Sequence, residues 1–156
     1  MVRMTYVGLG AVDAAVREFE LLTPHVRDLL ALQRECKPLS ADHAALGIAL
    51  DAVETAAFHF TRRRYFYHAV REDEGGRGGG NGRLGDRMEA LKAFKALAAY
   101  HGALGAMQRR CRPFGRDYLA IEIAKQGLDT AAYHFTREES LYGAKGDGGG
   151  ATRPVF

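Results

Sequence analysis

Two histidines that stand in the same eight-residue pattern are the residues of this chain best suited to chemistry. His59 lies in Thr-Ala-Ala-Phe-His-Phe-Thr-Arg, and His134 lies further along the chain in Thr-Ala-Ala-Tyr-His-Phe-Thr-Arg. An imidazole can exchange a proton near neutral pH and can ligate a metal ion. Three interpretations follow: hydrogen-bonded structural histidines, ligands of a metal ion or haem, or polar anchors in a pocket for a small apolar ligand.

A metal or haem site would use both imidazoles, with Glu138 as a third candidate ligand. His134 and Glu138 have i,i+4 spacing, which places them on one helix face. The position that corresponds to Glu138 after His59 is Arg63, a cation where a second carboxylate would be needed. Because Glu-x-x-His pairs are also lacking, the symmetric di-metal site of ferritin-like bundles is excluded. The metal alternative is therefore one ion held by His59, His134 and Glu138.

The pocket alternative depends on the level of the histidines along their helices. When the rise of a helix, roughly 1.5 Å per residue, is counted from the hairpin turns, both histidines fall in one core layer. We expect both side chains to be mostly buried in that layer, each with a hydrogen-bond partner or a ligand. The candidate ligand-binding residues are His59, His134, Phe19, Phe94, Phe60, Phe135, Thr55 and Thr130.

Basic residues gather at the turn of each helical hairpin. We expect them to project from the same end of the molecule, where they would attract an acidic protein, RNA or DNA. The aromatic residues nearby are Phe114 and Tyr118, so stacking on bases has little support. The residues of these basic tips are Arg34, Lys37, Arg109, Arg110, Arg112 and Arg116.

The sequence contains no pattern typical of an enzyme. Serine occurs only at Ser40 and Ser140, and neither stands in a Gly-x-Ser-x-Gly context. Cys36 and Cys111 form no CxxC motif and are interpreted as reduced structural thiols. His101, at a position where the first half has Val26, is interpreted as a core histidine. We therefore predict no catalytic residues and no enzymatic activity.

An internal duplication positions all of these residues. The shift that carries His59 onto His134 aligns 61 positions without a gap, and 22 of them are identical. Glycine-rich runs divide the chain, and glycine favours unfolded linkers because it loses the most backbone entropy on ordering. We predict one domain, 1–156, with a first repeat at about 9–73, a linker at 74–85, a second repeat at about 86–143 and a disordered tail at 144–156.

Each repeat has the pattern of a helical hairpin. Apolar residues recur every three or four positions over about 11–35, Pro38 follows that helix, and Ser40 is the expected N-cap of the next. We expect Pro24 to kink the first helix, while its counterpart at Ala99 leaves the third helix continuous. The predicted fold is all-α: an antiparallel up-down-up-down four-helix bundle of two tandem hairpin repeats with pseudo-twofold symmetry.

Composition indicates the class of protein but does not indicate its function. The 156 residues carry a net charge of +3, and two cysteines make no disulfide framework, so we expect a cytoplasmic protein without a membrane span. We predict a soluble, non-enzymatic bundle without a cofactor that binds a protein partner or small ligand in a scaffold or regulatory role, with a homodimer as one arrangement. The alternatives are the metal- or haem-binding bundle and a nucleic-acid-associated accessory protein that uses the basic tips.

Overall fold

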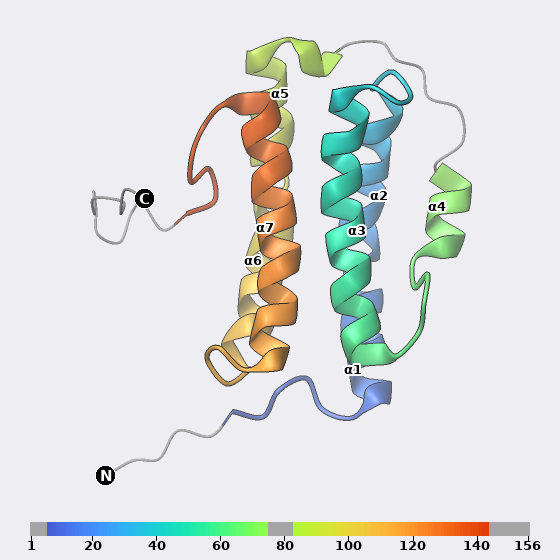
Figure 1. Cartoon of the computed structure of the whole chain (residues 1–156), viewed down its shortest axis with the longest axis vertical. Helices are drawn as coiled ribbons and strands as arrows, with labels where there is room; N and C mark the ends of the chain where they lie inside the picture. Colours follow the sequence, from blue (N-terminus) through green and yellow to red (C-terminus); the bar gives the residue numbers. More distant parts are fainter. Residues whose placement is uncertain (1–5, 75–82, 144–156) are drawn as a thin grey trace.

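The computed structural model describes residues 6–74 and 83–143, and within these ranges the chain is all-helical, without strands (Figure 1). The predicted tail at 144–156 and residues 75–82 of the predicted linker at 74–85 lie outside the described residues, whereas both described edges of that linker, Glu74 and 83–85, are helical. The helices are α1 (Val12–Glu20), α2 (Thr23–Arg34), α3 (Ala41–Thr61), α4 (His68–Glu74), the 3₁₀ turn η1 (Arg83–Gly85), α5 (Arg87–Lys95), α6 (Ala98–Arg109) and α7 (Arg116–Thr136).

The helix boundaries recur at the spacing of the sequence repeat. Helices α5, α6 and α7 begin and end at the positions equivalent to the bounds of α1, α2 and α3. The six non-glycine residues with positive φ also form three equivalent pairs: Leu39 and Phe114, Arg62 and Arg137, and Tyr65 and Ser140. The two halves therefore have the same local backbone conformation, including its rarely adopted positions.

The hairpin turns are stabilised by side-chain hydrogen bonds, of which the glutamine bond occurs in both repeats and the serine cap only in the first. Ser40 is the N-cap of α3, as predicted, and its hydroxyl accepts a hydrogen bond from the His43 amide at 3.1 Å. The Gln33 amide donates to the His43 carbonyl at 3.2 Å, and Gln108 donates to the Tyr118 carbonyl at the same distance. These bonds join each tip to the helix that follows it.

The break in the first long helix is not caused by proline alone. Helix α1 ends before α2, and α5 ends before α6 at the equivalent position, although Ala99 stands where the first repeat has Pro24. The expectation of a continuous third helix is therefore wrong. In both repeats a tyrosine hydroxyl bonds a carbonyl at the break: Tyr67 donates to the Phe19 carbonyl, and Tyr142 donates to the Phe94 carbonyl. This bond satisfies an oxygen beside the interruption of the helical ladder.

The long helices α3 and α7 run antiparallel, which overturns the predicted up-down-up-down order. His59, near the end of α3, contacts Asp117 at the start of α7, while His134, near the end of α7, contacts Asp42 at the start of α3. In an up-down-up-down bundle these two helices would be parallel and diagonal. The two hairpin turns consequently lie at opposite ends of the molecule (Figure 1).

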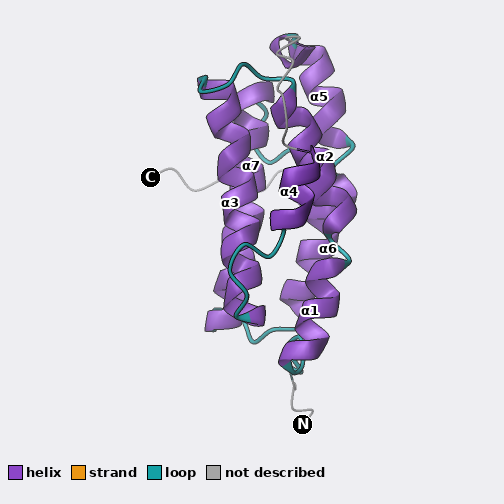
Figure 2. Ribbon diagram, turned by 90° about the vertical axis from the view of Figure 1, so that its right-hand side faces the viewer, coloured by secondary structure: helices purple, strands orange, loops and turns teal. Residues whose placement is uncertain are grey.

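Small side chains allow α3 and α7 to approach closely. A Cβ atom placed on Gly127 would lie 2.5 Å from the Cβ of Ala52 and 3.2 Å from the Ile48 carbonyl oxygen. Figure 2 shows α3 and α7 on the left as one layer, with α1, α2, α5 and α6 beside them on the right. The buried small residues of the two helices are Ala45, Ala49, Ala52, Ala56, Ala57, Ala120, Ala124, Gly127, Ala131 and Ala132.

The larger apolar side chains fill the space between the two layers. Phe19, Phe94, Leu46 and Ile121 are fully buried there. Burial of this apolar surface is the main force that holds the helices together. None of the described helices combines the length and the apolar character needed to cross a membrane.

Candidate functional site

Each of the two histidines is bonded to an aspartate of the other repeat. The Nε2 atom of His59 lies 2.8 Å from Oδ1 of Asp117, and Nε2 of His134 lies 2.8 Å from Oδ1 of Asp42. The histidine side chains are 29% and 30% exposed, and the aspartates about half. Ion pairs with this much solvent contact typically contribute up to about 1 kcal/mol. The pairs connect the two ends of the α3–α7 contact.

The two histidines do not share a core layer, contrary to the prediction. Asp42 lies in the first turn of α3, and His59 lies in the last turn of the same helix. His134 contacts Asp42 and is therefore at the other end of α3 from His59. With a rise of about 1.5 Å per residue, the separation of positions 42 and 59 along α3 is about 25 Å. A shared layer requires both hairpin tips to lie at the same end of the molecule. The antiparallel arrangement of α3 and α7 puts the tips, and hence the two histidines, at opposite ends.

The predicted aromatic layer is likewise divided into two clusters. The ring centroids of Phe19 and Phe60 are 5.6 Å apart in one cluster, and those of Phe94 and Phe135 are 5.5 Å apart in the other. Each histidine ring packs edge-on against the phenylalanine that follows it, at 4.8 Å. The structure thus brings each histidine to its own phenylalanine pair and keeps the two sets apart.

Thr55 and Thr130 lie on the surface rather than beside the histidines. The Thr55 hydroxyl donates to the Asp51 carbonyl of its own helix at 2.9 Å. Thr55 borders a shallow surface hollow of about 350 Å³ along α3, and Thr130 borders one of about 550 Å³ along α7. Neither hollow is lined by a histidine. The proposed pocket between the two imidazoles is therefore wrong.

The proposed metal or haem site fails for the same geometric reason. An ion or a haem iron has ligands about 2 Å away, so His59 and His134, about 25 Å apart, cannot both ligate it. Glu138 lies 3.9 Å from the Arg87 guanidinium instead. Within residues 6–74 and 83–143, no group of three histidine, cysteine or acidic side chains is arranged to hold a metal ion.

The remaining polar groups of the core are poorly suited to act as nucleophiles or bases. Burial raises the pKa of the Cys36 thiol to about 11 and also raises that of Cys111, so both stay protonated at neutral pH. The thiols donate to the carbonyls of Leu32 and Met107. Burial lowers the pKa of His101, whose ring stacks on Tyr142 at 4.9 Å. The two thiols are thus bonded to backbone carbonyls, and the His101 ring lies 3.6 Å from the Asp129 carboxylate.

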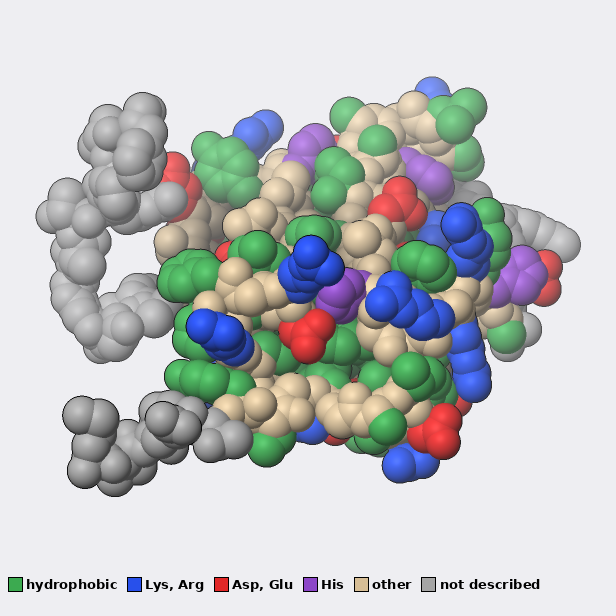
Figure 3. Space-filling model, turned by 60° about the horizontal axis from the view of Figure 1, so that its bottom comes forward, with side chains coloured by type: hydrophobic (Ala, Val, Ile, Leu, Met, Phe, Trp, Pro, Cys, Tyr) green, Lys and Arg blue, Asp and Glu red, His purple; other side chains and the backbone are tan. Residues whose placement is uncertain are grey.

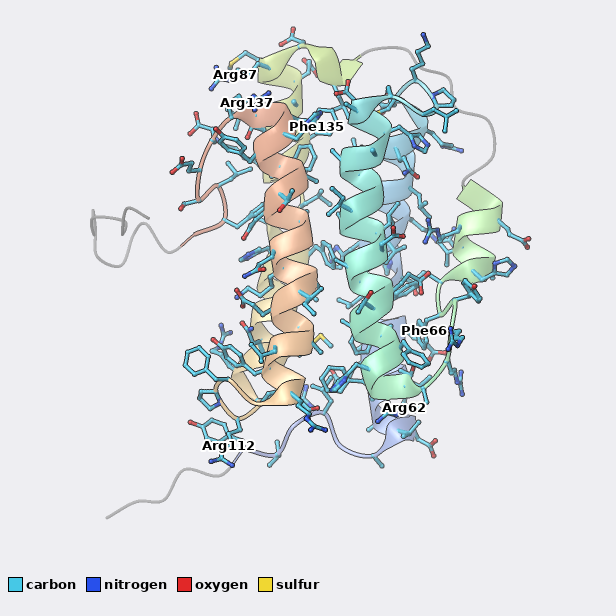
Figure 4. All side chains as sticks on the ribbon, viewed as in Figure 1. Arg62, Phe66, Arg87, Arg112, Phe135 and Arg137 are labelled. Carbon is cyan, nitrogen blue, oxygen red and sulfur yellow. The ribbon has the colours of Figure 1, made fainter. Side chains whose placement is uncertain are left out.

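Basic residues from two distant segments meet at one end of the molecule. Because His59 contacts Asp117, the segment after α3 lies near the turn before α7. Figure 4 shows Arg62 and Arg112 at this end and Arg87 and Arg137 at the other. The arginine-rich end consists of Arg62, Arg63, Arg64, Arg109, Arg110, Arg112 and Arg116.

The prediction that all six basic-tip residues share one end is therefore wrong. Arg34 and Lys37 belong to the opposite tip, and they are replaced at the arginine-rich end by the three arginines that follow α3. The repeats differ in charge at the corresponding places: Arg63 and Arg64 correspond to Glu138 and Glu139. Arginine in place of glutamate at these two positions makes the arginine-rich end more positive than the opposite end.

Two carboxylates at the arginine-rich end pair with basic side chains. Arg110 forms an ion pair with Glu18 at 2.9 Å, and Asp117 is occupied by His59. Within the described part of the chain, the other arginines of this end form no ion pair, and all of them are exposed. Figure 3, which brings this end forward, shows Lys and Arg side chains spread over the surface. The arrangement can attract and contact an anionic partner.

Sequence reasoning missed the partners of the residues that it selected. Asp42 and Asp117 occur at equivalent places in both repeats, but their position in the first helical turn suggested a capping role alone. Tyr67 and Tyr142 are also shared, which is the signal that would have found their role. No family model, curated protein or solved structure matches the chain. The function is accordingly inferred from the chemistry of the surface.

Proposed function

We propose that this protein is a non-catalytic helical module that binds a negatively charged macromolecule through its arginine-rich end. The observation that carries the proposal is the convergence of Arg62, Arg63 and Arg64 with the basic turn before α7. Clustered cations produce a local field that raises the association rate and affinity of anions, even though the whole chain carries only +3. A scaffold or regulatory role in the cytoplasm fits a chain with two protonated, buried cysteines.

The proposed architecture is a four-helix bundle in which two kinked and two straight helices form tandem, pseudo-twofold repeats within one domain. Two contacts support this symmetry, because each joins residues at equivalent positions of the two repeats. Ala52 lies against Gly127, and the rings of His25 and Tyr100 stack at 5.3 Å. Equivalent residues can touch each other only near a twofold axis. The axis would pass through both contacts and exchange the arginine-rich end with the opposite end.

A second candidate partner is a protein, including another copy of this chain, bound to the outer face of α3 and α7. Ile48 and Ile123 are equivalent in the two repeats and are 48% and 46% exposed on that face. Leu119 is exposed beside them. Exposed apolar side chains that cluster on one face are typical of interaction surfaces. This candidate would use a different surface from the arginine-rich end.

The proposed function predicts that charge reversal weakens anion binding only at one end. The variant Arg62→Glu/Arg112→Glu should bind a fluorescein-labelled heparin oligosaccharide and a labelled oligothymidylate about tenfold or more weakly, because two phosphate or sulfate contacts are lost. The control variant Lys37→Glu/Arg137→Glu changes the two equivalent residues of the other end and has the same net charge. Its affinity should remain within about threefold of the wild type. Fluorescence anisotropy measures both.

Thermal unfolding by circular dichroism shows whether each variant retains its fold. Exposed charges at helix ends typically change stability by no more than about 1 kcal/mol, so both variants should remain folded. An equal loss of binding in the two variants would mean that affinity follows net charge, and the proposed surface would be wrong. Wild-type protein that binds neither polyanion at low salt would refute the proposed function.

A further inference from the structure

We propose that the partner of the arginine-rich end is a single-stranded nucleic acid, one of whose bases stacks on Phe114. The inference rests on the proposed function and adds the class of partner. It arises from an aromatic side chain that projects from the turn before α7, between Arg112 and Arg116. Arginines that contact phosphates and an aromatic ring that receives a base are the two elements of sequence-tolerant single-strand binding.

Phe114 is held away from the core by its backbone. Its φ angle is +63°, a conformation that bulky residues rarely adopt, and its side chain is 78% exposed. The ring of Tyr118 lies 5.3 Å from that of Phe114 at an interplanar angle of 49°. Tyr118 packs against the core and therefore supports the exposed ring. One free face of Phe114 remains available to a planar group.

The tip of the first repeat shows which properties of Phe114 occur only at the arginine-rich end. Leu39, the counterpart of Phe114, has a φ angle of +67° and is 97% exposed. Projection of the side chain is therefore a property of the turn in both repeats. At the arginine-rich end the turn reads Arg112-Pro-Phe114, whereas the other reads Lys37-Pro-Leu39. Arg110 and Arg116 also stand where the other repeat has Glu35 and Ala41, so the ring and the added positive charge occur at the same tip.

The arrangement favours a single strand over other anions. Stacked base pairs of a duplex do not expose their faces to a protein side chain, whereas unpaired bases do. Sulfated sugars carry charge but lack the planar aromatic face that a ring can stack on. Arg62, Arg63 and Arg64 follow the end of α3, and His59 joins that end to Asp117 at the start of α7, so a strand whose base rests on Phe114 would bring its phosphates toward both segments. The experiment also tests binding to acidic membranes.

The test compares Phe114→Ala with Leu39→Ala, the same truncation at the equivalent position of the other tip. Labelled oligothymidylate binding is measured by fluorescence anisotropy at fixed salt. Loss of one base–aromatic stack should weaken binding by Phe114→Ala about five- to a hundredfold, whereas Leu39→Ala should bind like the wild type. Phe114→Tyr, which keeps the ring, should restore most of the affinity. An abasic oligonucleotide of equal charge should bind the wild type and Phe114→Ala equally.

Three outcomes would overturn the inference while leaving the proposed function intact. The first is wild-type protein that binds heparin or duplex DNA as tightly as the single strand at equal salt. The second is Phe114→Ala that retains wild-type affinity for the oligothymidylate. The third is preferential binding to vesicles of phosphatidylserine and phosphatidylcholine, lost in Phe114→Ala. If the wild type binds none of these polyanions, both the inference and the proposed function are wrong.

Discussion

Gly127→Leu should strongly destabilise the protein. The first side-chain atom alone would lie 2.5 Å from the Cβ of Ala52 and 3.4 Å from the Cα of Ala49, so α3 and α7 must separate. Overpacking of this kind costs about 1–3 kcal/mol and sometimes more. We expect Gly127→Ala within that range, despite its better helix propensity, and Gly127→Leu above it. Urea unfolding followed by circular dichroism measures both.

Gly102→Ala provides the matched control for the close helix contact. Gly102 also lies in a helix, and a Cβ atom there would meet no described atom within 4 Å. Alanine is favoured over glycine in a helix interior by roughly 0.5–1 kcal/mol, so this variant should be slightly more stable than the wild type. If Gly127→Ala were stabilised to the same extent, the close approach of α3 and α7 would be wrong.

Tyr67→Phe should also destabilise the protein, because it removes a buried hydroxyl that makes a hydrogen bond. That hydroxyl donates to the Phe19 carbonyl at 2.6 Å, where α1 ends, and the side chain is 2% exposed. Removing one partner of a buried hydrogen bond leaves the other unsatisfied and costs about 1–3 kcal/mol. Tyr142→Phe, the equivalent change at Phe94, should have an effect of the same sign.

Tyr100→Phe removes a similar hydroxyl without removing a hydrogen bond. The Tyr100 hydroxyl is buried and has no hydrogen-bond partner among the described residues. Its removal relieves the desolvation of a polar group, so stability should stay the same or increase by up to about 1 kcal/mol. Equal losses in Tyr67→Phe and Tyr100→Phe would show that the bond to the Phe19 carbonyl does not stabilise the break between α1 and α2.

The features that could be predicted from the sequence depend on nearby residues. Ser40 caps the helix that follows it, and the periodic apolar residues lie on helices. These outcomes depend on hydrogen bonds and periodicity within a few positions, and such information is present in any short window. The break between α5 and α6 was missed because its shared partner, Tyr142, is far from Phe94 in the sequence.

The direction of the second hairpin could not be predicted in the same way. A glycine-rich segment between the repeats is compatible with either end of the molecule, so it carries no information about direction. The available signal was the matching stripes of small residues on α3 and α7, which meet where Gly127 lies opposite Ala52. Such stripes favour direct contact of two helices over a diagonal arrangement. The wrong direction then placed the histidines and the basic residues wrongly.

The antiparallel arrangement of the repeats is the central claim, since it assembles the arginine-rich end. It is tested most directly by the distance between spin labels at positions 39 and 114, measured by pulsed dipolar spectroscopy in a Cys36→Ala/Cys111→Ala background. Both tips are exposed, and helices α3 and α7, of 21 residues each, span about 31 Å between them. We expect a label separation of about 30 Å or more. A separation of about 10–15 Å, the spacing of neighbouring or diagonal helices, would place both tips at one end and contradict the account.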